Sequence, residues 1–335
     1  MPKSKLSYNI LMTGAGGFLG FNIAKDLINS GHKVTNFSRS HHEKLDTLGI
    51  KTITGNLNNP QNIKQAFEKN QLDSIIHVAA KIGMWGRYRD FYEVNVEGTK
   101  ELLNCAKKYH IKRFIFTSSP SVVFEKDDLE GVDETQPYPK HYLSAYAKTK
   151  AIAEDLVLKE DQNVLRTAAL RPHLIYGEDD PNLLPRLIKA KIQGRLKQIG
   201  LGQNLVDVIY VENAAKAHTQ ILESIDSNKN IQSSPYFIGQ ERPVNLWEFV
   251  NQLLESCGQT KVNQMISFNF AYIIGSLIEI VLRLTRQYNA DPPMTRFMAC
   301  QLAKSHYFCH KNASKDFNYS PSISIEESLH RLRKK

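Results

Sequence analysis

Cysteine is scarce in this sequence, and the few cysteines do not form a recognisable pattern. Among 335 residues there are four, and no two of them form a C-x-x-C pair: Cys105, Cys257, Cys300 and Cys309. Histidines do not cluster at metal-ligand spacing either. We therefore expect no disulfide framework and no metal site. Reduced thiols of this kind are typical of a cytoplasmic protein.

Long apolar runs are also missing. The first ten residues, MPKSKLSYNI, lack the apolar stretch of a signal peptide. The most apolar window, AYIIGSLIEIVLRL at 271–284, includes Glu279 and Arg283 and is too short and too charged for a membrane span. We expect a buried or surface-docking helix there. Peripheral attachment to a membrane or to a multienzyme assembly is the alternative to a freely cytoplasmic protein.

Charge is plentiful but unbalanced, with 43 basic against 34 acidic residues and a net charge of +9. That balance suits an anionic small molecule, nucleic acid or an anionic membrane surface. The sequence shows no basic–aromatic interleaving and no arginine-rich stripe, so we expect no nucleic-acid partner. The one dense basic cluster includes residues 331–335, which we interpret as a solvated tail. Attraction of this tail to acidic lipid is the alternative.

Strand-like and helical segments alternate along the first two thirds of the chain. Longer amphipathic stretches, such as 60–69 and 91–109, separate short runs rich in β-branched and aromatic residues. These runs lie at 8–14, 33–39, 50–56, 74–80 and 113–119, with further candidates at 164–172 and 206–211. The alternation predicts an α/β fold, in which a doubly wound parallel sheet of the Rossmann type has helices on both faces.

After about residue 240 the alternation stops and the sequence becomes mainly helical, with a late helix starting within 291–296. We interpret this part as a smaller cap on the carboxyl edge of the sheet, where ligands bind in such folds. The predicted dinucleotide-binding domain comprises 5–172 and about 203–232. The predicted substrate-binding cap comprises about 173–202 and 233–330.

The stretch ILMTGAGGFLG runs from a predicted strand through a glycine turn into a helix. Gly14 would permit the tight turn, Gly17 would let backbone N–H groups approach a pyrophosphate, and Gly20 would let the helix pack closely on the sheet. Because the turn opens a βαβ unit, it predicts a dinucleotide site rather than an ordinary turn. The contacts would come from Gly14, Gly16, Gly17, Phe18, Leu19 and Gly20.

The end of the second strand bears on which dinucleotide binds. NAD(H) sites place a carboxylate there for the ribose 2′-hydroxyl. This chain has Ser38 and Arg39 instead. A guanidinium grips a 2′-phosphate, which a carboxylate would repel. We therefore expect NADP(H), with NAD(H) as the alternative if Arg39 is only a solvated cation.

The segment SAYAKTK, at 144–150, places Tyr146 and Lys150 one helical turn apart and so on one helix face. Upstream, FTSSPSV ends a predicted strand and brings Ser119 and Ser121 to the carboxyl edge of the sheet. With the glycine turn, these residues make the chain resemble the extended short-chain dehydrogenases/reductases of the epimerase/dehydratase superfamily. That family combines a T-G-x-x-G-F-x-G turn, a Y-x-x-x-K pair and an upstream serine.

The resemblance implies roles for these residues in ketone reduction. Tyr146 would exchange a proton with the substrate oxygen. Lys150 would lower the phenol's pKa and hydrogen-bond the cofactor ribose. Ser119 would orient the substrate, with Ser121 as the second candidate. Further cofactor contacts implied by the matching segments GNLNN, HVAA and LRPHLIYG are Asn56, Leu57, Ala79, Ala80, Lys81 and Pro172. Arg171 would be structural. A homodimer built from 88–109 and 141–160 is also implied.

Within that family the chain resembles a lipid-directed branch, the 2-alkyl-3-oxoalkanoate reductases and the 3-beta-hydroxysteroid and sterol-4-carboxylate 3-dehydrogenases. The segments that carry this likeness include AAKIGMWGRYRDFYEVNVEGT, AYAKTKAIAE and PPMTRF. A lipid-like substrate is thereby implied. Its carboxylate would need a cation, and the candidates are Lys81, Arg87, Arg89 and Arg296. A nucleotide-sugar epimerase, dehydratase or reductase is the alternative enzyme, and a redox-sensing regulator is the non-enzymatic alternative.

Overall fold

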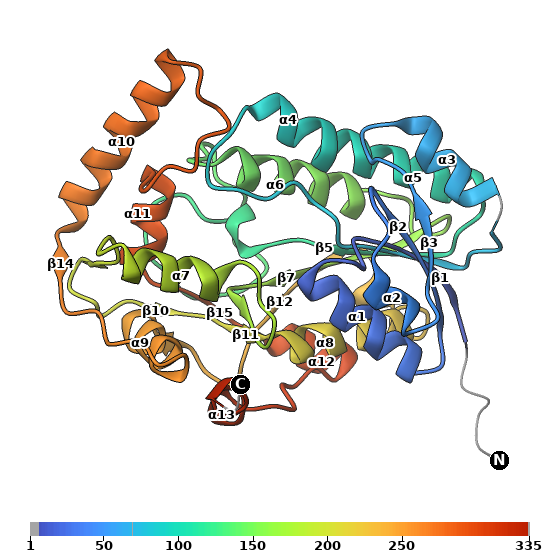
Figure 1. Ribbon diagram of the computed structural model, residues 1–335. Helices are drawn as coiled ribbons and strands as arrows, with labels where there is room; N and C mark the ends of the chain where they lie inside the picture. The colour runs from blue at the N-terminus through green and yellow to red at the C-terminus, as the bar shows by residue number, and fades with distance from the viewer. Residues whose placement is uncertain (1–6, 69, 334–335) are drawn as a thin grey trace.

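Parallel strands form the central sheet of the computed structural model, which describes residues 7–68 and 70–333 (Figure 1). The strands run in the order β12-β7-β5-β4-β1-β2-β3. They are β1 (Asn9–Thr13), β2 (Lys33–Ser38), β3 (Lys51–Thr54), β4 (Ser74–His77), β5 (Arg113–Thr117), β7 (Arg166–Pro172) and β12 (Ser234–Ile238). Because β1 is flanked by β2 and β4, the chain reverses its winding direction beside β1, and the crevice for a ligand lies at the carboxyl end of that strand.

Helices cover both faces of this sheet and bury two separate apolar layers. Along β1, Ile10 and Met12 point into one layer and Leu11 into the other, as the two-residue period of a strand requires. The first layer packs against α1 (Phe18–Asn29), α8 (Val211–Ser224) and α12 (Lys311–Phe317). The second packs against α3 (Pro60–Glu68), α5 (Gly98–Lys108) and α6 (Ala145–Leu158). The predicted Rossmann-type α/β architecture is confirmed.

Two sequence predictions about this sheet need correction. The run 206–211 is not one strand, because it divides into β10 (Leu205–Val206), β11 (Ile209–Tyr210) and the start of α8. Between the two short strands, Asp207 turns its carboxylate to the backbone N–H of Phe308 and to the His310 ring. In addition, β12 lies within the range expected for the cap but pairs with β7 as the edge strand of the central sheet.

The cap has its own apolar cluster and is mainly helical, as predicted. Its helices are α7 (Leu183–Ile192), α9 (Leu246–Ser256), α10 (Phe268–Leu284) and α11 (Arg296–Ala303). Short strands join them, among them β8 (Ile175–Tyr176), β9 (Gln198–Ile199), β13 (Val244–Asn245) and β14 (Met265–Ile266). Two more, β6 (Leu129–Val132) and β15 (His306–Phe308), complete a small sheet with β10 and β13. Helix α11 begins where 291–296 predicted a start, with the Thr295 hydroxyl accepting from the N–H of Met298.

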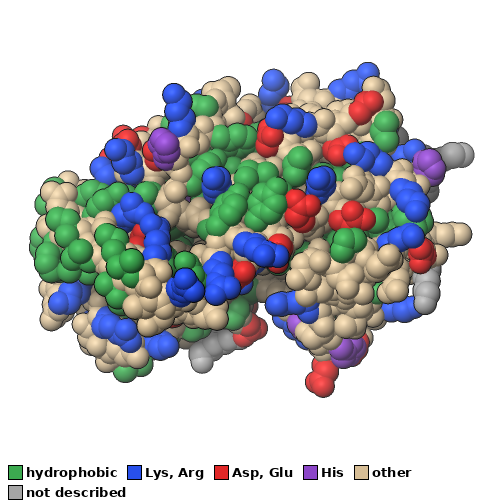
Figure 2. Space-filling view, turned by 90° about the horizontal axis from the view of Figure 1, so that it is seen from above, with side chains coloured by type: hydrophobic (Ala, Val, Ile, Leu, Met, Phe, Trp, Pro, Cys, Tyr) green, Lys and Arg blue, Asp and Glu red, His purple; other side chains and the backbone are tan. Residues whose placement is uncertain are grey.

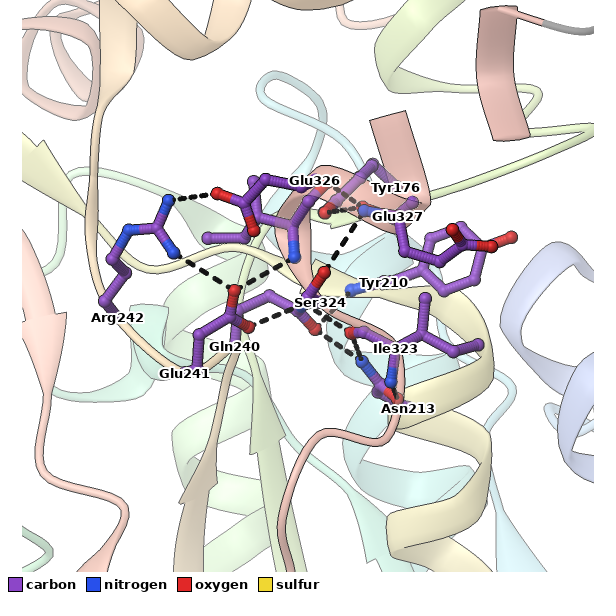
Figure 3. A network of polar contacts seen from close by, with 12 residues as sticks. Tyr176, Tyr210, Asn213, Gln240, Glu241, Arg242, Ile323, Ser324, Glu326 and Glu327 are labelled. Atoms are coloured by element: carbon purple, nitrogen blue, oxygen red, sulfur yellow. Dashed lines mark hydrogen bonds and ion pairs between the residues drawn. The ribbon is translucent and has the colours of Figure 1, made fainter. Parts of the chain in front are cut away.

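Much of the predicted basic tail is helical rather than free. Helix α13 spans Ile325–Arg333, Leu332 is buried, and Arg331 pairs with Glu327. Figure 3 shows how the segment before this helix is fastened: the Asn213 side chain accepts from the N–H and donates to the carbonyl of Ile323. Of the predicted tail and domain ranges, residues 5–6, 69 and 334–335 lie outside the described residues.

Candidate active site

The glycine turn lies against the chain that leaves β4. Gly14 has a φ of +76°, and a Cβ there would lie 2.9 Å from the backbone nitrogen of Ala79. A Cβ on Gly20 would overlap the carbonyl oxygen of Gly14. These two positions need glycine because backbone approaches backbone. The structure thereby brings the predicted phosphate turn and the predicted contacts Ala79 and Ala80 together at one edge of the sheet.

The N-terminus of α1 fits the phosphates of a dinucleotide. Gly17 precedes the helix in extended conformation, no side chain caps it, and the first turn has no acidic residue. The first-turn N–H groups of Phe18, Leu19 and Gly20 have no partner within a helix. The positive end of the helix dipole adds to this attraction for an anion.

At the end of β2, the predicted cation is available and the carboxylate typical of an NAD site is missing. Arg39 is exposed, and no carboxyl group occurs between Ser38 and His42. The Ser38 hydroxyl accepts from Asn36 and donates to the Ser40 carbonyl, which holds the strand end in place. The His42 ring covers Gly16 closely, so that a Cβ on Gly16 would overlap it.

A buried relay joins the glycine-turn strand to the middle of the sheet. The Thr99 hydroxyl donates to the Asn95 carbonyl, so it must accept from Nε2 of His77, 3.0 Å away. Nδ1 of the neutral ring is then the acceptor for the Thr13 hydroxyl at 2.7 Å, and that hydroxyl also accepts from the Ala79 N–H. Burial and the Lys150 ammonium lower the pKa of His77 to about 3, so the ring is neutral. His77 is thus a hydrogen-bonded core histidine, and its partner Thr13 lies 64 positions away in the sequence.

Asn95 ties the loop after β4 to the helix of the Tyr–Lys pair. Its Oδ1 accepts from the backbone N–H of Lys81, while Nδ2 donates to the Lys81 carbonyl and to the Thr149 hydroxyl. Asn95 lies in a π-helical turn, Glu93–Glu97, and such turns occur frequently at functional sites. This role of Asn95 has no local sequence signal, because the segment around it reads simply as a helix. The bridge to Thr149 spans 54 positions.

Tyr146 and the two candidate serines lie together. The Tyr146 side chain is partly exposed, and a hydrogen bond with the Ser119 hydroxyl lowers its pKa. Burial has the larger effect and leaves the pKa of Tyr146 above its ordinary value. The hydroxyl of Ser121 donates to that of Ser119 over 3.0 Å. Ser119 therefore stands between the phenol and Ser121.

The Lys150 ammonium is deeply buried and does not carry out the expected lowering of the Tyr146 pKa in this structure. Its Nζ donates to the backbone carbonyl of Thr117 and lies 3.8 Å from the ring centroid of Phe116. Burial lowers the pKa of Lys150 to about 7, against a smaller opposing effect of Glu154. The pKa of Tyr146 is set instead by burial and by Ser119. The prediction placed both groups on one helix face correctly, but it could not show where the ammonium points.

A buried ion pair lies one turn beyond Lys150. Arg171 and Glu154 are 2% and 0% exposed in their side chains and meet at 2.6 Å. The Tyr138 hydroxyl also donates to Glu154, over 2.7 Å. Arg171 thus has the structural surroundings that were predicted for it. Its neighbour Pro172 ends β7, buried at the carboxyl edge of the sheet.

A pair of buried histidines next to Pro172 was not predicted. Nε2 of His306 bonds to the carbonyl of Gln301, so it carries a proton and Nδ1 is an acceptor. Nε2 of His173 lies 2.6 Å from that Nδ1 and is the donor. Burial lowers the pKa of both rings. The two residues are 133 positions apart, and neither stands in a pattern that would have indicated the pair.

The remaining predicted cofactor residues lie near the β3 end. The Asn56 side chain accepts from the N–H of Asn58, and Leu57 is 9% exposed. A Cβ on Gly98 would lie 3.0 Å from the Leu57 carbonyl oxygen, so Gly98 of the VNVEGT segment lets α5 approach this loop. Gly98 therefore serves the packing of α5 against the loop after β3.

The four cations proposed to bind a substrate carboxylate have different surroundings in the structure. Arg296 pairs with the buried Glu279, and Arg89 is 86% exposed and pairs with Glu93. The Lys81 ammonium lies over the Phe91 ring. Arg87 lines a hollow of about 650 Å³ between the loop after β4, the start of α6 and the segment after α10. The other cations in its lining, which sequence reasoning did not propose, are Lys148, Arg283 and Arg286.

This hollow adjoins the Tyr–Lys helix without including the tyrosine. Its lining contains Ser144, Ala145 and Lys148 of that segment, with Trp85 and Tyr288 stacked across from one another. The Trp85 indole donates to the carbonyl of Gln287 over 3.0 Å, which joins the loop after β4 to the cap. None of the described residues in the lining is acidic. Among residues 7–68 and 70–333, no cluster of ligand side chains suited to a metal ion is found.

Comparison with known proteins places the chain in one family. Residues 11–270 match the family model of the 3-beta hydroxysteroid dehydrogenase/isomerase family. The chain is 40% identical to a 2-alkyl-3-oxoalkanoate reductase of Shewanella oneidensis, with 96% of this chain and 84% of the relative covered. It is also 40% identical to a 2-alkyl-3-oxoalkanoate reductase of Stenotrophomonas maltophilia, covering 97% and 98%.

A solved structure shows the same fold. The UDP-glucose 4-epimerase of Thermus thermophilus, in complex with NAD, superposes with a TM-score of 0.74 at 20% identity, covering 97% of each chain. The predicted resemblance to the hydroxysteroid dehydrogenases and the 2-alkyl-3-oxoalkanoate reductases is confirmed by the family model and the relatives, and the solved structure confirms the fold. Since the family model spans most of the chain, this protein belongs to the 3-beta hydroxysteroid dehydrogenase/isomerase family.

Proposed function

We propose that the chain is an NADP-dependent oxidoreductase that interconverts a ketone and a secondary alcohol on a lipid-like substrate of the 2-alkyl-3-oxoalkanoate type. One observation carries the proposal. The Tyr146 phenol bonds to Ser119 at the carboxyl edge of the sheet, with Lys150 one turn along the same helix. The names of the two bacterial relatives support the substrate class.

In this mechanism the chain's own groups orient the carbonyl and supply a proton. Ser119 donates a hydrogen bond to the ketone oxygen, and Ser121 holds Ser119 in place. The reduced cofactor, when bound at the glycine turn, supplies the hydride that reaches the carbonyl carbon. Tyr146 gives its phenolic proton to the oxygen, so ketone, hydride and proton together make the alcohol. The reverse direction uses the same groups in the opposite roles.

Lys150 has two roles in the proposal. Its Nζ bonds to the Thr117 carbonyl of β5 and so anchors α6, the helix that also carries Tyr146. It also contacts the cofactor ribose. Asn95 contributes indirectly as a positioning residue, because it fixes both Lys81 and the neighbouring Thr149.

The decisive experiment for this mechanism is Tyr146→Phe. We expect a loss of kcat of about 10²- to 10⁴-fold in NADPH oxidation with a long-chain 2-alkyl-3-keto acid, and unchanged NADPH binding by calorimetry. Tyr109→Phe, which removes a phenol that stacks on Phe67 away from the site, is the matched control. A Tyr146→Phe enzyme with full kcat would refute the mechanism.

We further propose that Arg39 selects NADP(H) over NAD(H), because it is an exposed cation at a strand end without a carboxylate. Arg39→Ala should raise the KM for NADPH about tenfold or more and leave that for NADH unchanged, since the loss of a charged hydrogen-bonded contact costs about 1.5–3 kcal/mol. Lys33→Ala, at the other end of β2, serves as control. Equal effects on both cofactors, or tighter binding of NADH than NADPH by the parent enzyme, would contradict the assignment.

The substrate class can be tested by competition among three kinds of compound. Long-chain 2-alkyl-3-keto acids, 3β-hydroxysteroids and nucleotide sugars are offered in turn while the absorbance of the reduced cofactor is followed. Turnover only of nucleotide sugars would favour the epimerase-like alternative. Unaltered cellular function of Tyr146→Phe would favour a redox-sensing regulator.

We also propose a cytoplasmic homodimer in which 88–109 and 141–160 of two copies pack together. These ranges include α5 and α6, which already contact one another. Light scattering should then give twice the 38.2 kDa of one chain. A mass of one chain at micromolar concentration would contradict the dimer.

A further inference from the structure

Helix α10 presents a row of large apolar side chains that none of the described residues covers. At 100° per residue, the six positions fall within an arc of about 100°. Each side chain is at least 50% exposed: Phe270, Ile273, Leu277, Ile280, Val281 and Leu284. Figure 1 shows α10 at the outer margin of the cap, and Figure 2 shows apolar side chains gathered over that end of the molecule. So large an exposed apolar surface marks an interaction site.

The opposite face of α10 is fixed to the cap, so the exposed face cannot turn inward. Gly275 lets α11 approach, since a Cβ there would lie 2.6 Å from the carbonyl carbon of Thr295. Glu279 is 2% exposed, and its carboxylate accepts two hydrogen bonds of 2.8 Å, one from the backbone N–H of Arg296 and one from the Arg296 guanidinium. Rotation of the helix would leave this carboxylate buried without its partners.

Further apolar side chains are exposed next to the start of α10. Strand β14, which precedes the helix, pairs with β9, and the Gly200 N–H donates to the Ile266 carbonyl. Two further apolar side chains stand out at this end, Met265 at 62% and Leu201 at 78% exposure. Exposed apolar side chains are therefore also present next to the start of α10.

The surroundings of this surface are basic. The stretch 183–201 contains five basic residues and no acidic one: Arg186, Lys189, Lys191, Arg195 and Lys197. It joins the start of α10 through β9. The stretch 262–288 contains Arg283, Arg286 and a single acid, the buried and paired Glu279. Cations therefore stand near both ends of the apolar row.

We propose that α10 lies in the plane of an anionic lipid surface, with its apolar row in the acyl boundary and the flanking cations at the headgroups. A helix that is apolar toward the outside and flanked by Lys and Arg has the character of an interfacial helix. A second copy of the chain fits less well. Whether the two helices run parallel or antiparallel, basic ends would face basic ends, and such contacts repel.

The same orientation places the hollow next to the lipid. Arg283 in the last turn of α10, and Arg286 and Tyr288 in the segment after it, line the hollow together with Trp85. A lipid-like substrate could then pass from the acyl layer toward the Tyr–Lys helix without crossing water. This last step rests on the proposed function, whereas the lipid contact itself does not.

Vesicle sedimentation without substrate or cofactor tests the contact. Wild-type protein is mixed with vesicles of phosphatidylcholine alone or with about a third phosphatidylglycerol. We expect binding to the anionic vesicles to be about tenfold tighter or more, and to weaken when salt rises to about 0.5 M. The double variant Leu277→Gln/Leu284→Gln should lose binding at least tenfold. The control Val164→Gln, at a residue 47% exposed in the α6–β7 connection, should keep it.

Three results would overturn the proposal. The first is that the wild type binds neither kind of vesicle, and the second is that the double variant binds anionic vesicles as tightly as the wild type. The third is that light scattering gives a doubled mass for the wild type and for Val164→Gln but not for the double variant. That last result would assign the surface to a second copy. Reduction of a short, water-soluble β-keto acid should be unchanged in the double variant, with an unchanged melting temperature showing that it folds. Vesicle binding in a protein without reductase activity would retain the lipid contact and refute the proposed function alone.

Discussion

Replacing Lys150 by methionine should make the protein more stable at neutral pH while abolishing ketone reduction. Lys150 is 2% exposed, and burial lowers its pKa from 10.5 to about 7. An unfolded chain holds the proton through this range, whereas the folded chain begins to lose it at about pH 7. The folded state therefore bears the cost of a buried ammonium, and a methionine of similar length would not bear it.

The size of this cost follows from the two pKa values. A change of one unit in pKa corresponds to about 1.36 kcal/mol. A pKa of Lys150 lowered from 10.5 to about 7 therefore disfavours the folded state by about 4 kcal/mol at pH 7, relative to a neutral side chain. Methionine would lose the hydrogen bond to the Thr117 carbonyl and the contact with the Phe116 ring, together worth about 2–3 kcal/mol. The net expected gain is about 1–2 kcal/mol, or about 1–3 °C in a chain of this length.

The pH dependence gives the sharper test. Between pH 7 and 10.5 the unfolded chain binds one proton more at this residue, so the stability of the wild type rises with pH. The buried-ammonium cost falls to about 2 kcal/mol at pH 9. Thermal melts at pH 7 and pH 9, without cofactor, should therefore show the advantage of Lys150→Met disappearing. Lys148→Met, on the exposed side of the same helix, is the matched control. A Lys150→Met protein that melts below the wild type at pH 7, or an advantage that persists at pH 9, would refute the reasoning.

Two further substitutions test the surroundings of the site. Glu154→Gln leaves the buried Arg171 without its counter-charge and should lower the free energy of unfolding by about 3–5 kcal/mol in urea titrations. The control Glu160→Gln removes a more exposed ion pair with Lys107 and should lower it by about 1 kcal/mol or less. Equal losses in the two variants would contradict the assigned role of the buried pair. Gly20→Ala places a methyl group against the Gly14 carbonyl and should cost about 1–3 kcal/mol and weaken NADPH binding in calorimetry. At Gly17 the new methyl would lie 3.3 Å from the same oxygen, so Gly17→Ala should destabilise the fold less, and the reverse order would show that the turn is not packed as described.

Features that depend on neighbouring positions could be predicted from the sequence. The alternation of strands and helices, the glycine turn between β1 and α1, and the Tyr146–Lys150 pair on α6 all follow from local periodicity and from the backbone freedom of glycine. The strands at the centre of the sheet were found because continuous runs of apolar residues identify buried parallel strands. The family resemblance added the roles of these residues, which no local pattern supplies.

Contacts between distant segments decided the rest. The division of 206–211 depends on Asp207 meeting residues about a hundred positions later, and β12 joins the sheet because β7 offers it an edge. The orientation of Lys150 is set by a carbonyl of β5, and the bridge made by Asn95 depends on a helix 54 positions away. The apolar side of α10 faces outward because Glu279 is held by Arg296 on the other side. Local patterns make both faces of that helix apolar, and only the tertiary packing decides which of them is left exposed.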